Sequence, residues 1–193
     1  MSTKRPSPSR EAVLDVVVEL LETQGYDSVH VREVAKRARI SSKTIYQTYE
    51  SRDDLIVSAL ERWMATSIYA NFEMPQPDDS LRDSLLRMLR AVFGPWEQHP
   101  RMLEAWYKTF SGTDHGRLSM QGVAEAHRVG DPLLDREDPA YARDLEEILT
   151  NLVVGLISRF VHGELAITDI MAILERTVVR LTAGVPAEGL TGG

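Results

Sequence analysis

Apolar residues recur through most of the chain at the spacing of an amphipathic α-helix. The first stripe falls at positions i, i+3, i+4, i+7 and i+8, and it consists of Val13, Val16, Val17, Leu20 and Leu21. Residues at this spacing share one face of a helix. Gly25 follows the stripe in the sequence "QGY", and glycine commonly terminates helices. The pattern therefore predicts a first helix that ends just before Gly25.

Two short helices and a longer one are predicted next. The short helices span about Val31 to Ala38 and Ser42 to Tyr49, and a tight break around "RIS" separates them. The longer helix spans about Asp53 to Phe72, and its apolar side is formed by Leu55, Ile56, Ala59, Leu60, Trp63 and Met64. Two short helices joined by such a break are typical of a helix-turn-helix.

The rest of the chain also has helical periodicity, and no alternating strand pattern interrupts it. The pairs Gly94-Pro95 and His99-Pro100 are expected to break the helices there. The predicted helices are Ser80–Phe93, Arg101–Phe110, Leu118–Val129, Ala140–His162 and Thr168–Leu181, the last with Thr168 or Asp169 as its cap. The sequence therefore predicts an all-α fold of about nine helices.

Charge and composition divide the chain into four predicted segments. Residues 28–52 carry six Lys/Arg against two Asp/Glu, whereas residues 53–193 carry 13 against 22. A basic helix-turn-helix domain, residues 10–52, is followed by an acidic helical body, residues 53–185. Residues 1–9 and 186–193 are predicted to form a flexible arm and a flexible tail.

Composition also limits the classes of protein that the chain can belong to. There is no cysteine, which excludes disulfides and thiolate sites and fits a reducing cytoplasm. The longest apolar run is "LVVGLI", Leu152 to Ile157, far short of the roughly 20 residues that span a bilayer. No secretory signal precedes the first helix. We therefore expect a cytoplasmic protein with no membrane partner.

An enzyme is the first alternative to weigh. The sequence has no P-loop, no glycine-rich dinucleotide loop, no GxSxG and no HExxH. Asp114 and His115 are adjacent in "SGTDHG". A catalytic or metal site needs further partners that the sequence does not indicate, so a polar loop is the favoured interpretation. We expect no catalytic residue, no metal site and no cofactor.

DNA is the partner that the second short helix fits. In a helix-turn-helix, that helix lies in the major groove with its N-terminal residues toward the base edges. Lys43 can donate to guanine and Gln47 can pair with adenine, while Thr48 offers a methyl or a hydroxyl. Tyr46 and Arg52 suit phosphate contacts. The predicted DNA-binding residues are Arg39, Ser41, Ser42, Lys43, Thr44, Tyr46, Gln47, Thr48 and Arg52.

The same stretch resembles a known family. "VREVAKRARISSKTIYQTYESRDDLIVSAL", Val31 to Leu60, is similar to the signature of TetR-type bacterial transcriptional repressors. That signature has an isoleucine-alanine pair, an alanine-glycine-valine-serine turn, a threonine-leucine-tyrosine core and a phenylalanine before serine-lysine. The corresponding elements here are Val34-Ala35, "ARIS", "TIY" and Tyr49 before Ser51-Arg52. The resemblance implies operator DNA as a partner and a helical domain for effector binding and dimerisation.

Two residues depart from that signature. Arg39 stands where the family has glycine in the turn, and a left-handed backbone there would cost arginine about 1 kcal/mol unless the turn differs slightly. The extra charge is expected to reach a phosphate. His30 stands where the family has a serine or threonine N-cap, and histidine caps helices poorly.

An effector pocket is predicted where aromatic and methionine residues gather around the two proline pairs. Such side chains line adaptable apolar pockets, although each of them alone equally suits an ordinary core. The predicted ligand-binding residues are Met88, Phe93, Trp96, Met102, Trp106, Tyr107, Phe110, His127 and Asn151. The segments "HPRMLEAWYKTF" and "AITDIMAILERTVVRL" further resemble steroid-catabolism repressors of the family, whose known ligands are bulky sterol-derived thioesters. That resemblance implies a large apolar effector.

The last two predicted helices are candidates for a homodimer interface. Two helices from each subunit can form a four-helix interface, and Gly155 would let them approach closely. The predicted interface residues are Leu152, Leu156, Phe160, Ile170, Ile173, Leu174 and Val178. The sequence leaves open which face of each helix points outward. A helical adaptor, or a DNA-binding protein without an effector, is the alternative to a ligand-responsive repressor.

Overall fold

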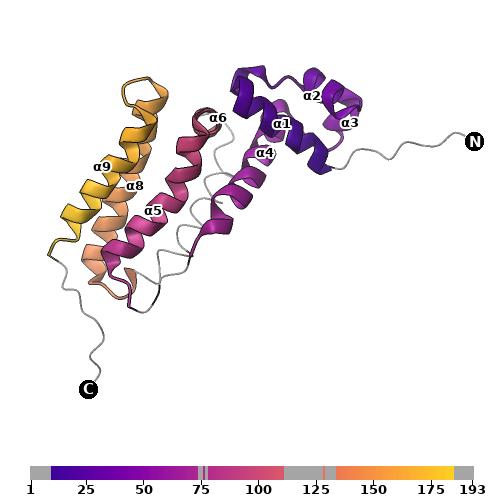
Figure 1. Ribbon diagram of the computed structural model, residues 1–193. Helices are drawn as coiled ribbons and strands as arrows, with labels where there is room; N and C mark the ends of the chain where they lie inside the picture. Colours follow the sequence, from indigo (N-terminus) through magenta and orange to yellow (C-terminus); the bar gives the residue numbers. More distant parts are fainter. Residues whose placement is uncertain (1–9, 74–75, 77, 111–127, 129–133, 185–193) are drawn as a thin grey trace, which may run out of the picture. The chain divides into compact units, whose positions relative to one another are not determined.

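A computed structural model of the chain describes residues 10–73, 76, 78–110, 128 and 134–184 (Figure 1). These residues form eight α-helices and two short 3-10 turns, with no strand among them, which confirms the predicted all-α fold. The predicted helix Leu118–Val129 lies, except for Arg128, outside the described residues, as do the predicted arm and tail. The elements are α1 (Arg10–Gln24), η1 (Tyr26–Ser28), α2 (Val31–Ala38), α3 (Ser42–Tyr46), α4 (Arg52–Ser67), η2 (Tyr69–Asn71), α5 (Leu81–Gln98), α6 (Pro100–Phe110), α8 (Pro139–Val161) and α9 (Ile167–Leu181).

The chain divides into two compact units. The first comprises Met1–Ala65 and His99–Ser119, and the second comprises Thr66–Gln98 and Met120–Gly193. The first unit therefore contains α6 together with the helix-turn-helix, although the sequence analysis assigns α6 to the acidic body. The predicted domain boundary between residues 52 and 53 stays a prediction.

The first unit is held together by the apolar faces from which its helices were predicted. In α1, Val17, Leu20 and Leu21 are completely buried. Gly25 follows α1 with a φ of 85°, a conformation that glycine adopts at little cost, so the helix ends where the sequence predicts. Full burial of such a side chain contributes about 1.5–3 kcal/mol. Packing, rather than intrinsic helix propensity, therefore fixes these short elements.

α6 packs against α1 and begins at a proline. Pro100 occupies the first position of the helix, where its missing N–H would have no intrahelical partner in any case. Met102, Leu103 and Ala105 are fully buried. Arg101 donates to the backbone carbonyl at the end of α1. These contacts explain why α6 belongs to the same compact unit as the helix-turn-helix.

In the second unit, α5 corrects one expectation. The pair Gly94-Pro95 does not end the helix, which continues through Pro95 to Gln98. Proline removes one backbone hydrogen bond and crowds the preceding turn, but here it falls close to the helix end. Phe93 and Trp96 are 4% and 3% exposed, so their burial holds the last turn in place.

α9 is the central packing element of the second unit, because it contacts both α5 and α8 (Figure 1). Ile170, Leu174 and Val178 are at most 1% exposed. Arg90 of α5 pairs with Glu175 of α9 at 2.8 Å. The N-cap of α9 is Ala166, which makes no side-chain cap hydrogen bond, so the predicted caps at Thr168 and Asp169 are wrong. By contrast, Asp138 caps α8 by accepting two backbone N–H groups at 3.0 Å.

The start of α4 is tied to η1 by Arg52. Its Nε donates to the Val29 carbonyl at 2.6 Å, its Nη2 donates to the Tyr26 carbonyl, and its Nη1 lies 3.0 Å from Asp53 Oδ1. The guanidinium also lies over the Tyr26 ring, 4.4 Å from its centroid. All three nitrogens are thus engaged inside the chain. The Arg52 side chain therefore holds the helix-turn-helix to α4. The phosphate contact predicted for it stays a prediction.

Tyr26 connects this junction to α6. Its hydroxyl donates to Asp53 Oδ1 at 2.8 Å, and Lys108 Nζ of α6 lies 5.5 Å from its ring centroid and 2.9 Å from Asp27 Oδ2. Burial, followed by the hydrogen bond to Asp53, raises the pKa of the Tyr26 phenol above its ordinary value. The hydrogen bond from Lys108 lowers the pKa of the Asp27 carboxyl. The turn before α2 is therefore held by the start of α4 and the end of α6.

Replacing Arg52 should destabilise the fold. Arg52→Ala removes the hydrogen bonds to two carbonyls and the contact with the Tyr26 ring, and it is expected to lower the free energy of unfolding by about 2 kcal/mol. Arg37→Ala is the matched control, because Arg37 makes exposed ion pairs with Glu33 and Glu19 and should cost less than about 1 kcal/mol. Urea unfolding followed by circular dichroism measures both. Equal, small losses would show that the junction does not hold α4.

Candidate nucleic-acid interface

α3 is anchored on its inner side and capped at its start. Ser41 is the N-cap, and its Oγ accepts the Thr44 N–H at 3.1 Å and lies 2.9 Å from the Thr44 hydroxyl. Ile45 and Tyr49 are 2% and 3% exposed and fix the inner side of the segment. Ser41 therefore has a structural role, beside the DNA contact predicted for it.

The outer side of α3 carries the remaining polar residues predicted to contact DNA. Tyr46 is 56% exposed, and Ser42 is half-buried. The helix ends at Tyr46, earlier than predicted, but Gln47 keeps helical dihedral angles with φ −75° and ψ −18°. The other exposed polar residues are Lys43, Thr44, Gln47 and Thr48. Together they offer ammonium, amide and hydroxyl groups, which are the groups that hydrogen-bond to base edges.

The turn between α2 and α3 contains a strained residue. Arg39 has φ 58° and ψ 40°, the left-handed conformation expected for the glycine position of the signature. Ile40 N–H donates to the Ala35 carbonyl at 2.9 Å, which closes the turn. Arg39 is exposed. His30 makes no side-chain cap hydrogen bond at the start of α2, as the sequence predicts.

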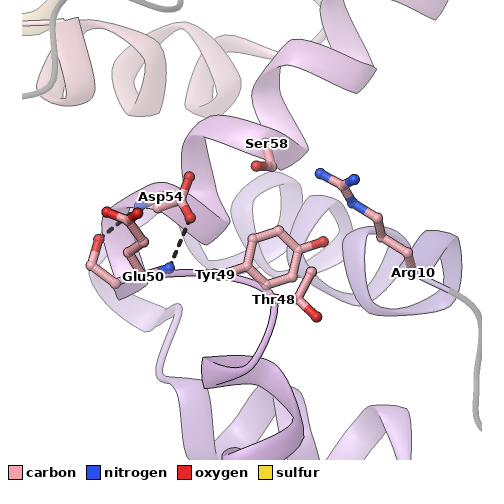
Figure 2. A pocket seen from close by; sticks show the side chains of 7 residues that line it. Arg10, Thr48, Tyr49, Glu50, Asp54 and Ser58 are labelled. Atoms are coloured by element: carbon pink, nitrogen blue, oxygen red, sulfur yellow. Dashed lines mark hydrogen bonds between the residues drawn. The ribbon is translucent and has the colours of Figure 1, made fainter.

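A polar hollow of about 400 Å³ lies beside the end of α3 (Figure 2). In its wall, Ser51 Oγ accepts the Asp54 N–H at 3.0 Å, and Asp54 Oδ2 accepts the Glu50 N–H at 2.9 Å. These bonds cap α4 and fix the loop after Tyr49. The lining residues are Arg10, Thr48, Tyr49, Glu50, Ser51, Asp54 and Ser58. The hollow is polar, so it does not correspond to the apolar effector pocket predicted from the sequence.

The residues predicted to bind an effector fall in both units. In the second unit, Phe93 and Trp96 are buried and Met88 is half-buried. In the first unit, Met102 is fully buried, and Trp106 and Tyr107 are half-buried. Phe110 is the last residue of α6, and His127 lies outside the described residues.

Asn151 does not belong to a buried apolar pocket. It is exposed on α8, and its Nδ2 donates to the Glu147 carbonyl at 2.8 Å within the same helix. The structure therefore corrects its prediction as a ligand-binding residue. In the sequence, an isolated asparagine among apolar residues of a helix suggests a polar group inside a pocket. The folded structure is needed to show that Asn151 lies on the exposed face of α8.

The predicted dimer interface needs a larger correction. Leu156, Ile170, Leu174 and Val178 are between 0% and 3% exposed, so they form the core of the subunit and are not available to a partner. Leu152, Phe160 and Ile173 are half-buried.

Other apolar residues of the same helices are exposed instead, and none of them is among the interface residues predicted from the sequence. Ile148 and Val154 of α8 are 46% and 40% exposed, and Val179 of α9 is 43% exposed. Among described residues, Tyr46 of α3 is the remaining large apolar side chain in this class. The second apolar face of α8 was the signal that could have found Ile148 and Val154.

The described residues contain no group of three or more His, Asp or Glu side chains placed to hold a metal ion. None of the helices within 10–73, 78–110 and 134–184 is both long and apolar enough to cross a membrane.

Two family profiles match the chain. Residues 13–59 match bacterial regulatory proteins of the tetR family, and residues 79–181 match the tetracyclin repressor-like C-terminal domain. The HTH-type transcriptional repressor KstR of Rhodococcus jostii (strain RHA1) is 29% identical over 194 residues, covering 92% of this chain and 84% of that protein. KstR of Mycolicibacterium smegmatis is 29% identical over 164 residues, covering 78% of each chain.

Solved structures share the fold. A TetR transcriptional regulator from Rhodococcus sp. RHA1 superposes with a TM-score of 0.66 at 20% identity, covering 92% of this chain and 99% of that one. SCO7222, a TetR from Streptomyces coelicolor, gives a TM-score of 0.67 at 16% identity, covering 91% and 98%. At these identities the structures support the fold alone. The profile matches, together with the helix-turn-helix geometry, show that the chain belongs to the tetR family of bacterial regulatory proteins, which are transcriptional regulators and not enzymes.

Proposed function

We propose that the protein is a ligand-responsive transcriptional repressor that binds a near-palindromic operator as a homodimer in the cytoplasm. The observation that carries this proposal is the polar outer side of α3, held on an anchored helix-turn-helix. Lys43, Gln47 and Thr48 are exposed on it, and no apolar packing accounts for them. The relatives named KstR are repressors, which favours repression over activation.

In this proposal, base recognition and backbone contact are separate tasks. Lys43, Gln47 and Thr48 contact base edges in the major groove, where ammonium and amide groups distinguish guanine from adenine. Tyr46 and the hydroxyls of Ser42 and Thr44 contact phosphates, which position the helix without reading sequence. One α3 buries too little surface for tight specific binding, so two copies are required. Their operator half-sites then lie about 34–36 Å apart, or further if the DNA is deformed.

The homodimer is proposed to form through the outer faces of α8 and α9. Ile148, Val154 and Val179 are apolar yet exposed in the single chain, which is what an unoccupied partner surface requires. Gly155 lies on the same side of α8 as Ile148, seven residues later, and it is exposed with open space around its Cα. Its small size lets a partner helix approach closely. Half-buried Leu152 extends this face.

The effector is proposed to be a large apolar molecule. Its candidate contacts in the first unit are the aromatic residues of α6 that are only half-buried, namely Trp106 and Tyr107. Because α6 is bound to α1 and η1, a ligand that moves α6 acts on the helix-turn-helix directly. A constitutive DNA-binding protein without an effector is the second candidate, and ligand screening separates the two.

Base recognition is tested by Gln47→Ala. Loss of one base contact should weaken binding to the operator next to the coding region by about 1–3 kcal/mol and relax preference at one position. Gel shifts with single-base operator variants measure both effects. Glu50→Ala is a suitable control, because the Glu50 side chain is exposed nearby and has no assigned contact. Its hydrogen bond to Asp54 comes from the backbone N–H and is kept in the variant. Unchanged affinity and unchanged preference in Gln47→Ala would refute its role.

Dimerisation is tested by Val179→Glu. A charge placed in an apolar interface should dissociate the dimer, which sedimentation velocity at micromolar protein detects as a monomer with weakened operator binding. Arg180→Gln is the matched control: it is the next residue of α9 and also exposed, but it lies about 100° away around the helix. A Val179→Glu protein that stays dimeric would place the interface elsewhere.

The effector is tested by screening apolar acids, sterols and their coenzyme A thioesters for thermal stabilisation, followed by titration into the protein–operator complex. A tenfold loss of operator affinity requires about 1.4 kcal/mol of coupling, and operator DNA must weaken the ligand by the same factor. A compound that binds equally well with and without operator is not an inducer. If no compound stabilises the protein, the constitutive alternative is favoured.

A further inference from the structure

The cations of α1 to α4 fall into two groups that the sequence does not distinguish. Arg37 Nε lies 2.8 Å from Glu33 and its Nη1 lies 3.3 Å from Glu19. Arg62 pairs with Asp15 at 2.5 Å, and Arg52 is engaged with η1. These three charges are neutralised or hydrogen-bonded within the chain. They are therefore poor candidates for contacts with DNA.

The second group makes no hydrogen bond and no ion pair within the part of the chain that the structure describes. It consists of Arg10, Arg32, Lys36, Arg39 and Lys43, and all five are exposed. Arg10 differs from the others because its guanidinium lies over the Tyr49 ring, 5.7 Å from the centroid. Lys36 does lie close enough to Glu33 to add to the lowering of the pKa of that carboxyl. However, the first cause of that shift is the hydrogen bond from Arg37. Glu33 is thus already occupied.

Three of these cations lie along one edge. Arg32 and Lys36 are four residues apart on α2 and are therefore neighbours on the helix surface. Arg39 follows as the left-handed residue that ends the helix. Val31, Val34 and Ala38 are buried on the other side of α2. The edge is about 10 Å long at 1.5 Å per residue. A strip of that length can reach more than one phosphate of a DNA strand.

Backbone strain makes Arg39 unfavourable at its position, and charge repulsion makes Arg32 unfavourable at its position. Arg39 is a non-glycine residue in the left-handed region, with φ 58°, and glycine would remove that strain. Arg32 lies in the first turn of α2, where the helix dipole disfavours a cation, and it repels Lys36 one turn later. No partner inside the described chain offsets either cost. A DNA phosphate outside the chain would offset both costs.

We propose that Arg32, Lys36 and Arg39 form a phosphate-binding edge that holds one backbone strand of the DNA beside α3, while Arg37 and Arg52 make no DNA contact. This inference rests on the proposed DNA binding and adds the surface that anchors it. The first helix of a helix-turn-helix crosses the DNA backbone, which brings this edge to the phosphates. Lys43 continues the row onto α3, where the base edges begin.

The test uses a fluorescein-labelled 30-base-pair duplex of mixed sequence, because phosphates are contacted alike in every sequence. Anisotropy gives the affinity of the full-length protein between 50 and 200 mM KCl. Each lost phosphate contact should flatten the slope of log K against log salt by about 0.9. In a dimer, Arg39→Ala should therefore flatten it by about 1.8, and the affinity lost across this salt range should shrink about twelvefold. Arg32→Ala and Lys36→Ala should behave alike.

Arg37→Ala is the matched control, since it removes the same charge from the same helix but from an internally paired residue. It should leave the slope unchanged. Arg39→Lys should restore most of the slope, and Arg39→Gly should flatten it while raising Tm by about 2–4 °C through relief of the strained backbone.

Two results would overturn the edge. One is an Arg39→Ala slope equal to that of the unmodified protein, and the other is an Arg37→Ala slope as flat as that of Arg39→Ala, which would mean that only the overall charge matters. The failure of the proposed function looks different. If the unmodified protein shows no salt-dependent binding to any duplex, the proposal that the protein binds DNA is wrong. That result comes from the unmodified protein alone and does not depend on the variants.

Discussion

A helix of five residues cannot stabilise itself, and the function proposed here depends on how α3 is held. Isolated helices shorter than about 12–15 residues are marginal in water, whereas α3 spans only Ser42–Tyr46. Its position is therefore imposed from outside by a serine cap, by burial of Ile45 and Tyr49, and by the left-handed turn at Arg39. Everything that its outer face can recognise depends on these anchors. Because these anchors hold α3 from its inner side, its outer face is not needed for packing.

Much of this arrangement follows from the sequence, because short-range rules decide it. The bounds of α2 and the ends of α1 follow from apolar spacing and Gly25. The left-handed turn at Arg39 follows from the signature, which has glycine at that place. Arg52 shows where such reasoning stops. Its partners are the carbonyls of Tyr26 and Val29, which lie more than twenty residues away, and nothing in the spacing of apolar residues locates a free carbonyl.

The second unit shows a different limit. α8 and α9 carry apolar residues on more than one face, and periodicity identifies a helix without identifying which face meets α5. The side that packs inside the subunit contains Leu156 and Leu174, the residues assigned from sequence to the dimer. Exposure in the folded chain is what separates the two faces. The residues left for a partner, such as Ile148 and Val179, are fewer and less regularly spaced.

Residues that violate a local rule are informative about function only when a partner can reach them. Arg39 is strained but exposed, so a contact outside the chain can offset its cost. The Tyr49 hydroxyl makes the contrast. It is buried without a hydrogen-bond partner in the described structure, at a position where the family signature has phenylalanine, and such a group costs about 1–3 kcal/mol. Because the hydroxyl is closed off from solvent, DNA cannot satisfy it in this conformation. Packing of the ring accounts for Tyr49, and the hydroxyl has no place in the proposed recognition of DNA. Exposure, and not strain alone, is therefore the reason why Arg39 is proposed to contact DNA.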